Sequence, residues 1–403
     1  MSSRTLPIFL CFFLMGLVDA MGPLAGMIQK QYAISGFMAG LLPASAFVAF
    51  ALFSVPGGVL AARIGMRSLL ILALALNALG LVIPAVVMPG YTLLLGSVFV
   101  LGVGTTLLQV AGNPIMRDVS SPGRFARNLS FAQFIKGVGS VSSTALVAAL
   151  AVGATGWRRV FPVFLALTLV GLGSLLLLKI EPKRAGSPPS IAGSLALLKE
   201  RAFGLAVFGI FLYVGAEVGL TTWLSRRLEG LLFAGAGVGW ASALARGFSD
   251  LGFKGDPAAL LGPALFLFCL MLGRLVGSGV LHFLSSRAFF RVSAGLGVLG
   301  ILGLLSGVPS LAVAGAAVCG LGFANIWPLL FSLTVEARPE RSAELSGLMC
   351  MAIFGGAVLP PLMGRLRDIS GGFELAFVVP LAAFAYLLLL SLSGRGPAAV
   401  KEA

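Results

Sequence analysis

Charged side chains are scarce in this sequence. They make up 10% of its 403 residues, whereas a soluble domain carries about 25%. Hydrophobic residues make up 58% of the chain, and its mean hydropathy is +1.04. A water-soluble fold has no interior large enough for so much apolar surface, so the composition excludes a soluble protein. The surroundings of this chain must be a lipid bilayer.

Side chains that perform chemistry are also few. The chain has one histidine, four cysteines and 14 acidic residues, and their positions form no metal-ligand or nucleophile constellation. The sequence contains no phosphate-binding loop. We therefore expect no enzyme activity, no metal site, no cofactor and no direct use of ATP. The cysteines all lie in apolar stretches, where a small soft side chain packs well.

The chain does contain a series of apolar runs, each close to the roughly 20 residues that cross the hydrocarbon core as a helix. Because that core offers no water to an unpaired backbone group, each run must be helical. The sequence therefore predicts an all-α membrane protein with twelve transmembrane helices. The predicted spans are 7–29, 37–61, 69–87, 91–114, 128–152, 160–178, 203–224, 260–283, 292–305, 311–335, 345–363 and 375–392.

The net charge of +14 would suit a nucleic-acid partner, but its placement favours another explanation. If the N-terminus is inside, the cytoplasmic segments carry more Lys and Arg than the external ones, as the positive-inside rule requires. We predict cytoplasmic termini and no nucleic-acid partner. The sequence Val18-Asp19-Ala20 loosely suits signal-peptide cleavage, but the apolar run continues to Ile28, so we interpret it as a retained first span.

One long polar stretch divides the spans into six and six, and three features recur in both sets. The first span of each set has a midspan acid, the fourth an Asn and a Pro, and the fifth close glycines. The pairs are Asp19 and Glu217, Asn113-Pro114 and Asn325 to Pro328, and Gly137 with Gly139 against Gly355 with Gly356. Such symmetry is typical of many transporters. It predicts pseudo-symmetric six-helix bundles at 1–180 and 202–403, joined by a cytoplasmic linker at 181–201.

Four charged residues lie well inside predicted spans: Asp19, Lys136, Glu217 and Arg274. A charge there costs several kcal/mol and usually faces a cavity or a partner. Asp19 is the first candidate for proton coupling, with Lys136 as its natural partner, although the two could instead form a permanent structural ion pair. Glu217 is open to substrate binding, proton transfer or gating. Arg274 is interpreted as a structural or gating residue.

Neutral polar and aromatic side chains inside the spans suit a sugar, whose hydroxyl groups need both donors and acceptors. The amides are Gln109, Asn113, Gln133 and Asn325, and the aromatic residues are Trp327, Trp223 and Tyr213. The alternative for the amides is hydrogen bonding between helices. The alternative for the aromatic rings is packing or an interfacial belt.

The segment between the seventh and eighth spans, residues 226–259, carries apolar residues at helical spacing. They are Trp240, Leu244, Phe248 and Leu251. This spacing predicts a short helix at the membrane interface. An ordered external loop is the alternative.

Several motifs together resemble one transporter family. They are Gly16 to Pro23, Leu108 to Pro114, Asn128 to Gln133, Tyr213 to Glu217, Gly273-Arg274, Pro328 to Leu333, and Gly355-Gly356 followed by Pro360 to Gly364. With them, nearly the whole chain resembles the major facilitator superfamily, and within it the bacterial fucose and glucose/galactose proton symporters. The Tyr213 to Glu217 run favours the glucose/galactose branch.

The resemblance implies that Asp19 occupies the proton-coupling position and Gln133 a sugar-contacting one. Two positions depart from the fucose-symporter pattern. Gln109 stands where those proteins have a glutamate, and Lys136 stands where they have an asparagine. One titratable group of the pattern is thus absent, and a cation is placed near Asp19.

A superfamily loop motif between the second and third spans is incomplete. Arg63 and Arg67 are present, and the resemblance implies gating or structural roles for them, but Ala62 replaces the usual aspartate.

We predict a secondary transporter for a small polar solute, with a glucose-, galactose- or fucose-like monosaccharide as the first candidate. It would work by alternating access around a central polar cavity, with a proton as the coupling ion. The alternatives are a proton-driven exporter of amphipathic compounds in the same superfamily and an uncoupled sugar facilitator. We expect a monomer in the bacterial cytoplasmic (inner) membrane.

Overall fold

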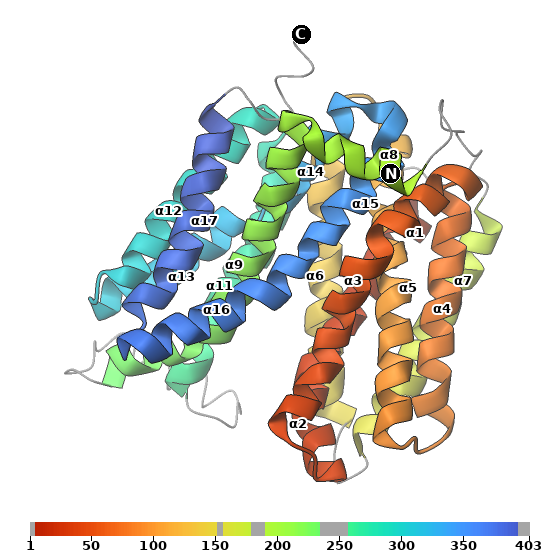
Figure 1. Cartoon of the computed structure of the whole chain (residues 1–403), viewed down its shortest axis with the longest axis horizontal. Coiled ribbons are helices and arrows are strands. Elements are labelled where there is room, and N and C mark those ends of the chain that lie inside the picture. The colour runs from red at the N-terminus through yellow and green to blue at the C-terminus, as the bar shows by residue number, and fades with distance from the viewer. Residues whose placement is uncertain (1–4, 151–155, 179–189, 234–256, 394–403) are drawn as a thin grey trace. The chain divides into compact units, whose positions relative to one another are not determined.

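The regular elements of the chain are helices (Figure 1). The computed structural model describes residues 5–150, 156–178, 190–233 and 257–393, and these ranges contain no strand. Eleven helical segments among them are long and apolar enough to cross a membrane, from Thr5–Tyr32 to Glu374–Leu392. Helix α6, Phe125–Leu150, adds 26 residues, or about 39 Å of helix. The prediction of an all-α fold with twelve spans is confirmed.

Contacts divide the chain into two compact units. Unit 1 comprises Met1–Glu200 with Val335–Ala352, and unit 2 comprises Arg201–Thr334 with Ile353–Ala403. Val335–Ala352 comes from the second half of the sequence, yet its contacts place it in unit 1. The predicted bundles at 1–180 and 202–403 and the linker at 181–201 stay predictions.

Unit 1 is built around α5, which packs against α3 and α4, while α7 packs on α4 and α6 packs on α1 and η1. Helix α15 lies against α3 and α5. Trp157, Phe161 and Phe164 are among its fully buried side chains. Its helices are α1 Thr5–Met15, η1 Gly16–Ala20, α2 Met21–Tyr32, α3 Gly36–Ile64, α4 Met66–Val86, α5 Tyr91–Asp118, α6, η2 Gly156–Arg159, α7 Val160–Leu177, α8 Ile191–Ala196, η3 Leu197–Lys199, η4 Pro339–Arg341 and α15 Ser342–Met351.

In unit 2, α12 packs with α13 and α17, and α9 packs with α11, α16 and α17. Phe323 and Phe384 stack in its core with ring centroids 3.9 Å apart. The helices are α9 Arg201–Phe233, α11 Pro257–Val280, α12 Ser286–Leu305, α13 Pro309–Phe323, α16 Gly355–Ser370 and α17 Glu374–Leu392, with α14 Ile326–Ala337 and η5 Ala352–Phe354 continuing across the unit boundary.

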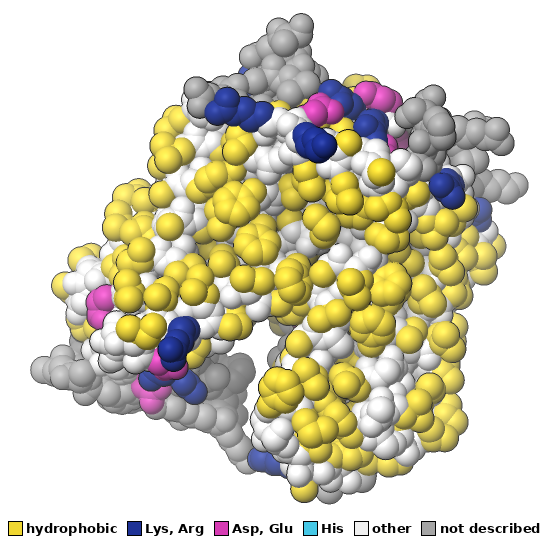
Figure 2. Space-filling view, in the orientation of Figure 1, with side chains coloured by type: hydrophobic (Ala, Val, Ile, Leu, Met, Phe, Trp, Pro, Cys, Tyr) yellow, Lys and Arg dark blue, Asp and Glu magenta, His cyan; other side chains and the backbone are white. Residues whose placement is uncertain are grey.

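The outer faces of the helices are apolar. Large side chains are widely exposed there, including Phe37 at 78%, Leu177 at 86% and Leu389 at 66%. In Figure 2, hydrophobic side chains cover the middle of the helices and charged ones gather toward their ends. Exposed apolar surface on this scale marks contact with lipid.

A close helix crossing recurs in both units. A Cβ on Gly139 of α6 would collide with the carbonyl oxygen of Phe13 on α1, and one on Gly355 would collide with that of Phe211 on α9. Only glycine permits backbones to approach so closely, as small residues do in membrane helices. In each unit the midspan acid, Asp19 or Glu217, follows that phenylalanine by six residues. The matching crossings support the predicted duplication.

The segment between the seventh and eighth spans is shorter than predicted. Helix α9 continues to Phe233, and α11 begins at Pro257. The predicted interfacial helix with Trp240, Leu244, Phe248 and Leu251 lies outside the described residues, so it stays a prediction.

Candidate functional site

Three spans are interrupted, and two of the interruptions lie at predicted site residues. The first span changes from α-helix to the 3₁₀ segment η1, which contains Asp19. The tenth span breaks at Ala324 and Asn325, between α13 and α14, and the eleventh contains η5. Irregular backbone within a membrane is tolerated where it is buried in protein or lines a water-filled cavity. Breaks of this kind place Asp19 and Asn325 on irregular backbone inside their spans.

The Asp19 carboxylate is exposed rather than enclosed by protein. Its Oδ2 atom accepts a hydrogen bond of 2.5 Å from Ser140 Oγ on α6, the helix that packs most closely on η1. Lys136 lies one turn before Ser140 and is partly buried. The predicted ion pair between Lys136 and Asp19 stays a prediction.

In unit 1 the structure joins two of the predicted amides, those of Gln133 and Asn113, and ties them to the backbone of Gln109. Gln133 Nε2 donates to Asn113 Oδ1 at 3.1 Å, and Asn113 Nδ2 donates to the backbone oxygen of Gln109 at 2.9 Å. All three residues are buried, with exposed fractions of 5% or less. Cys350 of α15 lies beside Asn113. The group therefore links α5 to α6, as the interhelical alternative predicts, and consists of neutral donors and acceptors.

In unit 2, Arg274 connects three helices. Its Nη2 atom lies 3.7 Å from Glu217 Oε1 on α9, and its Nε atom donates to the carbonyl oxygen of Ala324 at 3.3 Å. Ala324 is the C-terminal cap of α13, where an Arg satisfies a backbone oxygen that the helix itself leaves unpaired. Arg274 is 8% exposed. Its guanidinium thus holds the broken tenth span and the midspan acid in one place.

Asn325 and Trp327 flank the same break, and both are buried. Asn325 Nδ2 donates to the carbonyl oxygen of Gly273 at 2.8 Å. Asn325 Oδ1 and Trp327 Nε1 have no hydrogen-bond partner among the described residues. A buried polar atom normally has a partner, so each such exception calls for an explanation. The break therefore leaves one acceptor and one donor unsatisfied.

Trp223 lies apart from these residues. Its Nε1 atom donates to the carbonyl oxygen of Pro360 at 3.0 Å. The guanidinium groups of Arg226 and Arg367 lie 5.6 and 5.7 Å from the ring centroid. These cation–π contacts occupy the ring that was expected to stack on a sugar. As a substrate contact, Trp223 stays a prediction.

The two arginines of the loop motif differ in their surroundings. Arg67 donates to the carbonyl oxygens of Leu175 and Leu176 at 3.3 and 3.0 Å, at the C-terminal end of α7. This contact ties the start of α4 to α7, which is a structural role. Arg63, in the last turn of α3, is exposed. Its predicted gating role stays a prediction.

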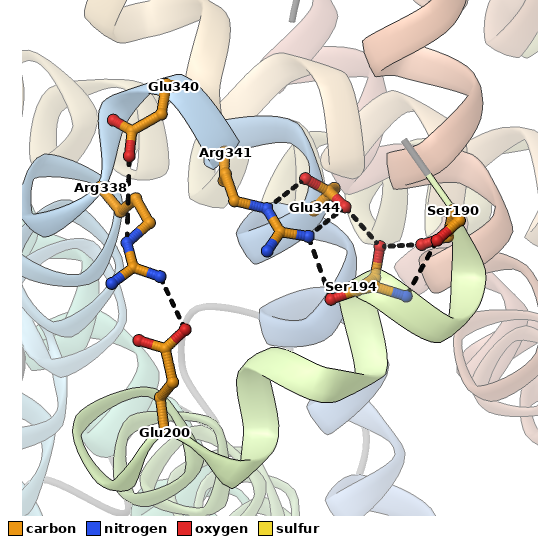
Figure 3. Close-up of polar contacts among 8 residues, drawn as sticks. Ser190, Ser194, Glu200, Arg338, Glu340, Arg341 and Glu344 are labelled. Atoms are coloured by element: carbon orange, nitrogen blue, oxygen red, sulfur yellow. Dashed lines mark hydrogen bonds and ion pairs between the residues drawn. The ribbon is translucent and has the colours of Figure 1, made fainter. Parts of the chain in front are cut away.

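A polar cluster in unit 1 that was not predicted from the sequence links α8 to α15 (Figure 3). Glu344 is 4% exposed and accepts two hydrogen bonds from Arg341, at 2.7 and 2.6 Å. Ser194 Oγ lies 3.0 Å from Glu344 Oε1, and Arg341 donates to the carbonyl oxygen of Gly193 at 3.0 Å. The spacing of Arg341 and Glu344 suggests a pair, but the partners on α8 lie far away in the sequence.

A second ion pair lies nearby. Arg338 Nη1 is 2.6 Å from Glu200 Oε1, and both side chains are more exposed than Glu344.

The contact of Ser140 with Asp19 was also not predicted from the sequence. A serine is common in membrane helices and carries no charge that would single it out.

Comparison with known proteins gives matches over the whole chain. The sequence profile of the Major Facilitator Superfamily matches residues 8–253. The chain is 28% identical over 408 residues to a glucose/galactose transporter of Brucella abortus, covering 98% of this chain and 93% of that protein. It is 23% identical over 407 residues to the L-fucose-proton symporter of Escherichia coli, covering 90% and 86%. The crystal structure of the E. coli fucose:proton symporter matches with a TM-score of 0.78 at 20% identity, covering 98% and 100%.

Proposed function

Because the chain belongs to the Major Facilitator Superfamily, and so is a multi-pass transporter and not an enzyme, we propose that it moves a monosaccharide together with a proton. The proposed substrate is of the glucose, galactose or fucose type, and the proposed mechanism is alternating access. The proposed location is the bacterial cytoplasmic (inner) membrane, with both termini cytoplasmic and the protein a monomer.

The observation that carries the proposal is the unmet hydrogen-bonding capacity at the break in the tenth span. Asn325 Oδ1 and Trp327 Nε1 are buried and lack a partner among the described residues. A sugar hydroxyl both donates and accepts, so it can serve both atoms. The Trp327 ring offers in addition an apolar face for a pyranose. Ligand sites combine such apolar walls with a few placed polar groups.

Five further residues are proposed sugar contacts: Gln109, Asn113, Gln133, Lys136 and Glu217. The amide group suits this because Gln133 and Asn113 already hold each other in fixed orientation. Side chains that are positioned in advance lose less freedom when the ligand binds.

Asp19 is the proposed proton carrier. Its carboxylate is accessible and lies in a 3₁₀ segment of the first span. Asp19 bonds Ser140, which lies one turn of α6 after Lys136, so uptake of a proton by Asp19 changes the charge at this helix crossing. Glu217, which lies near Arg274, is the second titratable candidate. Transport would then depend on a proton because the two protonation states favour different conformations.

The test uses purified protein in liposomes with an imposed proton gradient. Wild-type protein should accumulate labelled sugar against its gradient. Asp19→Asn should abolish accumulation but retain sugar exchange, since exchange needs no net movement of protons. Accumulation that ignores the proton gradient, or that persists in Asp19→Asn, would overturn proton coupling and leave an uncoupled facilitator.

The substrate itself can be identified by thermal stability. A ligand that binds the folded state raises the apparent Tm according to its concentration and affinity. We expect one or a few monosaccharides of a panel to stabilise the protein, and more strongly at the more acidic of two pH values. Stabilisation by amphipathic compounds and by no sugar would favour the exporter alternative.

A further inference from the structure

Ser140 stands between the midspan acid and the backbone of α6. Its Oγ atom is 2.5 Å from Asp19 Oδ2 and 3.2 Å from the carbonyl oxygen of Lys136. Both neighbours are acceptors when Asp19 is ionised. The contact crosses from α6 to η1 at the point where Gly16 brings the two backbones together, since a Cβ on Gly16 would collide with that same Lys136 oxygen. The position of Ser140 is thus fixed by the helix crossing.

A serine hydroxyl has one hydrogen to donate and two lone pairs to accept with. When Asp19 is ionised, the hydrogen of Ser140 points to the carboxylate, and this charge-assisted bond is the stronger of the two choices. When Asp19 is protonated, its own O–H donates to Ser140 Oγ, and the serine hydrogen turns to the Lys136 carbonyl. Both protonation states are therefore satisfied, but the ionised one gains more.

Other groups around Asp19 must be compared with this contact. The elements packed on η1 are α1, α2, α5 and α6. Their titratable or charged residues are Cys11 on α1, Lys30 and Tyr32 on α2, Tyr91, Arg117 and Asp118 on α5, and Arg127 and Lys136 on α6. Of those on α6, Lys136 is one turn from Ser140, and Arg127 is more than two turns further back. A nearby cation and a hydrogen-bond donor both favour an ionised carboxylate, and a substitution at Ser140 leaves Lys136 in place.

We propose that Ser140 is a positioning residue that sets the pH range of transport, by favouring the ionised form of Asp19 and exchanging its donor between that carboxylate and the Lys136 carbonyl. This inference rests on the proposed proton coupling through Asp19. Without the hydroxyl, the ionised carboxylate loses its donor, so uptake should persist to a higher outer pH. A hydrogen bond that stabilises the charged form of a group by about 1.4 kcal/mol changes its proton affinity tenfold, which corresponds to about one pH unit.

The experiment measures initial uptake of labelled sugar into proteoliposomes as the outer pH is varied, at fixed inner pH and zero membrane potential. Ser140→Ala should move the pH of half-maximal uptake upward by about one unit. Sugar exchange at saturating proton concentration should stay within about twofold of wild type, because the sugar contacts are untouched. In the Asp19→Asn background, Ser140→Ala should change nothing further.

The matched control is Ser143→Ala. Ser143 lies on the same helix, and its Oγ atom bonds two backbone oxygens, those of Ser140 at 2.8 Å and Gly16 at 3.4 Å. Its loss should leave the midpoint at the wild-type pH. Ser140→Thr, which keeps a hydroxyl, should also retain that midpoint.

Two failures are distinguishable. If wild-type uptake depends on pH and on Asp19, but Ser140→Ala keeps the wild-type midpoint, the role of Ser140 is overturned and the proposed function stands. An equal upward shift in Ser143→Ala or Ser140→Thr also overturns it. If wild-type uptake itself ignores pH, both the coupling and the role of Ser140 fall.

Discussion

Replacing Arg341 by Met is expected to destabilise the protein strongly, because it leaves the Glu344 carboxylate buried without its cation. Glu344 exposes 4% of its side chain, and its contacts are the two bonds from Arg341 and the hydroxyl of Ser194. Removing one partner of a buried ion pair costs about 3–5 kcal/mol. We take the lower end, about 3 kcal/mol, because the Ser194 hydroxyl remains.

Glu344→Gln should cost less, about 1–2 kcal/mol. The guanidinium of Arg341 is 24% exposed, so it can reach water after the carboxylate is lost. Arg341→Met combined with Glu344→Met should be more stable than Arg341→Met alone, since replacing the whole pair by apolar side chains leaves no buried charge. Restored stability in the double variant would measure the coupling between the two side chains directly.

The assay is thermal unfolding of the purified protein in detergent. For a chain of this size about 1 kcal/mol corresponds to roughly 2 °C in Tm, so Arg341→Met should lower Tm by about 6 °C. The matched control is Arg338→Met, which breaks an ion pair of 2.6 Å whose side chains are 29% and 42% exposed. Such a pair contributes at most about 1 kcal/mol. Equal losses in Arg341→Met and Arg338→Met, or purely additive effects in the double variant, would refute the reasoning.

Two further predictions concern packing and ligand binding. Gly139→Ala should lower the stability by about 1–3 kcal/mol, because its Cβ would collide with the Phe13 carbonyl oxygen. Gly173→Ala, whose Cβ meets nothing within 4 Å, should raise the stability by up to about 1 kcal/mol. Changes in Tm of the same sign in both variants would contradict a close approach of the backbones at Gly139. Trp327→Phe should weaken sugar binding about tenfold, the effect of one lost hydrogen bond, with the unliganded protein still folded. The control is Trp157→Phe, which also removes a buried indole N–H without a partner among the described residues and should leave the sugar affinity unchanged. Calorimetric titration measures both affinities. Equal affinities in the two variants would exclude Trp327 as a donor to the ligand.

The sequence alone determined the twelve spans and the short set of polar residues inside them. A transmembrane helix satisfies its backbone hydrogen bonds within one segment, so length and hydropathy suffice to locate it. Midspan charges such as Asp19 and Arg274 stand out for the same reason, since the bilayer makes each of them costly. The sequence also set Gly137 and Gly139 against Gly355 and Gly356, and the structure shows that Gly139 and Gly355 make the matching crossings.

The tertiary structure alone decided which side chains meet across helices. The hydroxyl that bonds Asp19 belongs to Ser140, more than 100 residues away, and Glu344 bonds Ser194 on a different helix. Trp223 met two arginines instead of joining the polar residues, and Val335–Ala352 packed with unit 1. Such contacts depend on the crossing and rotation of packed helices, which small residues permit but the hydropathy of a single helix does not specify.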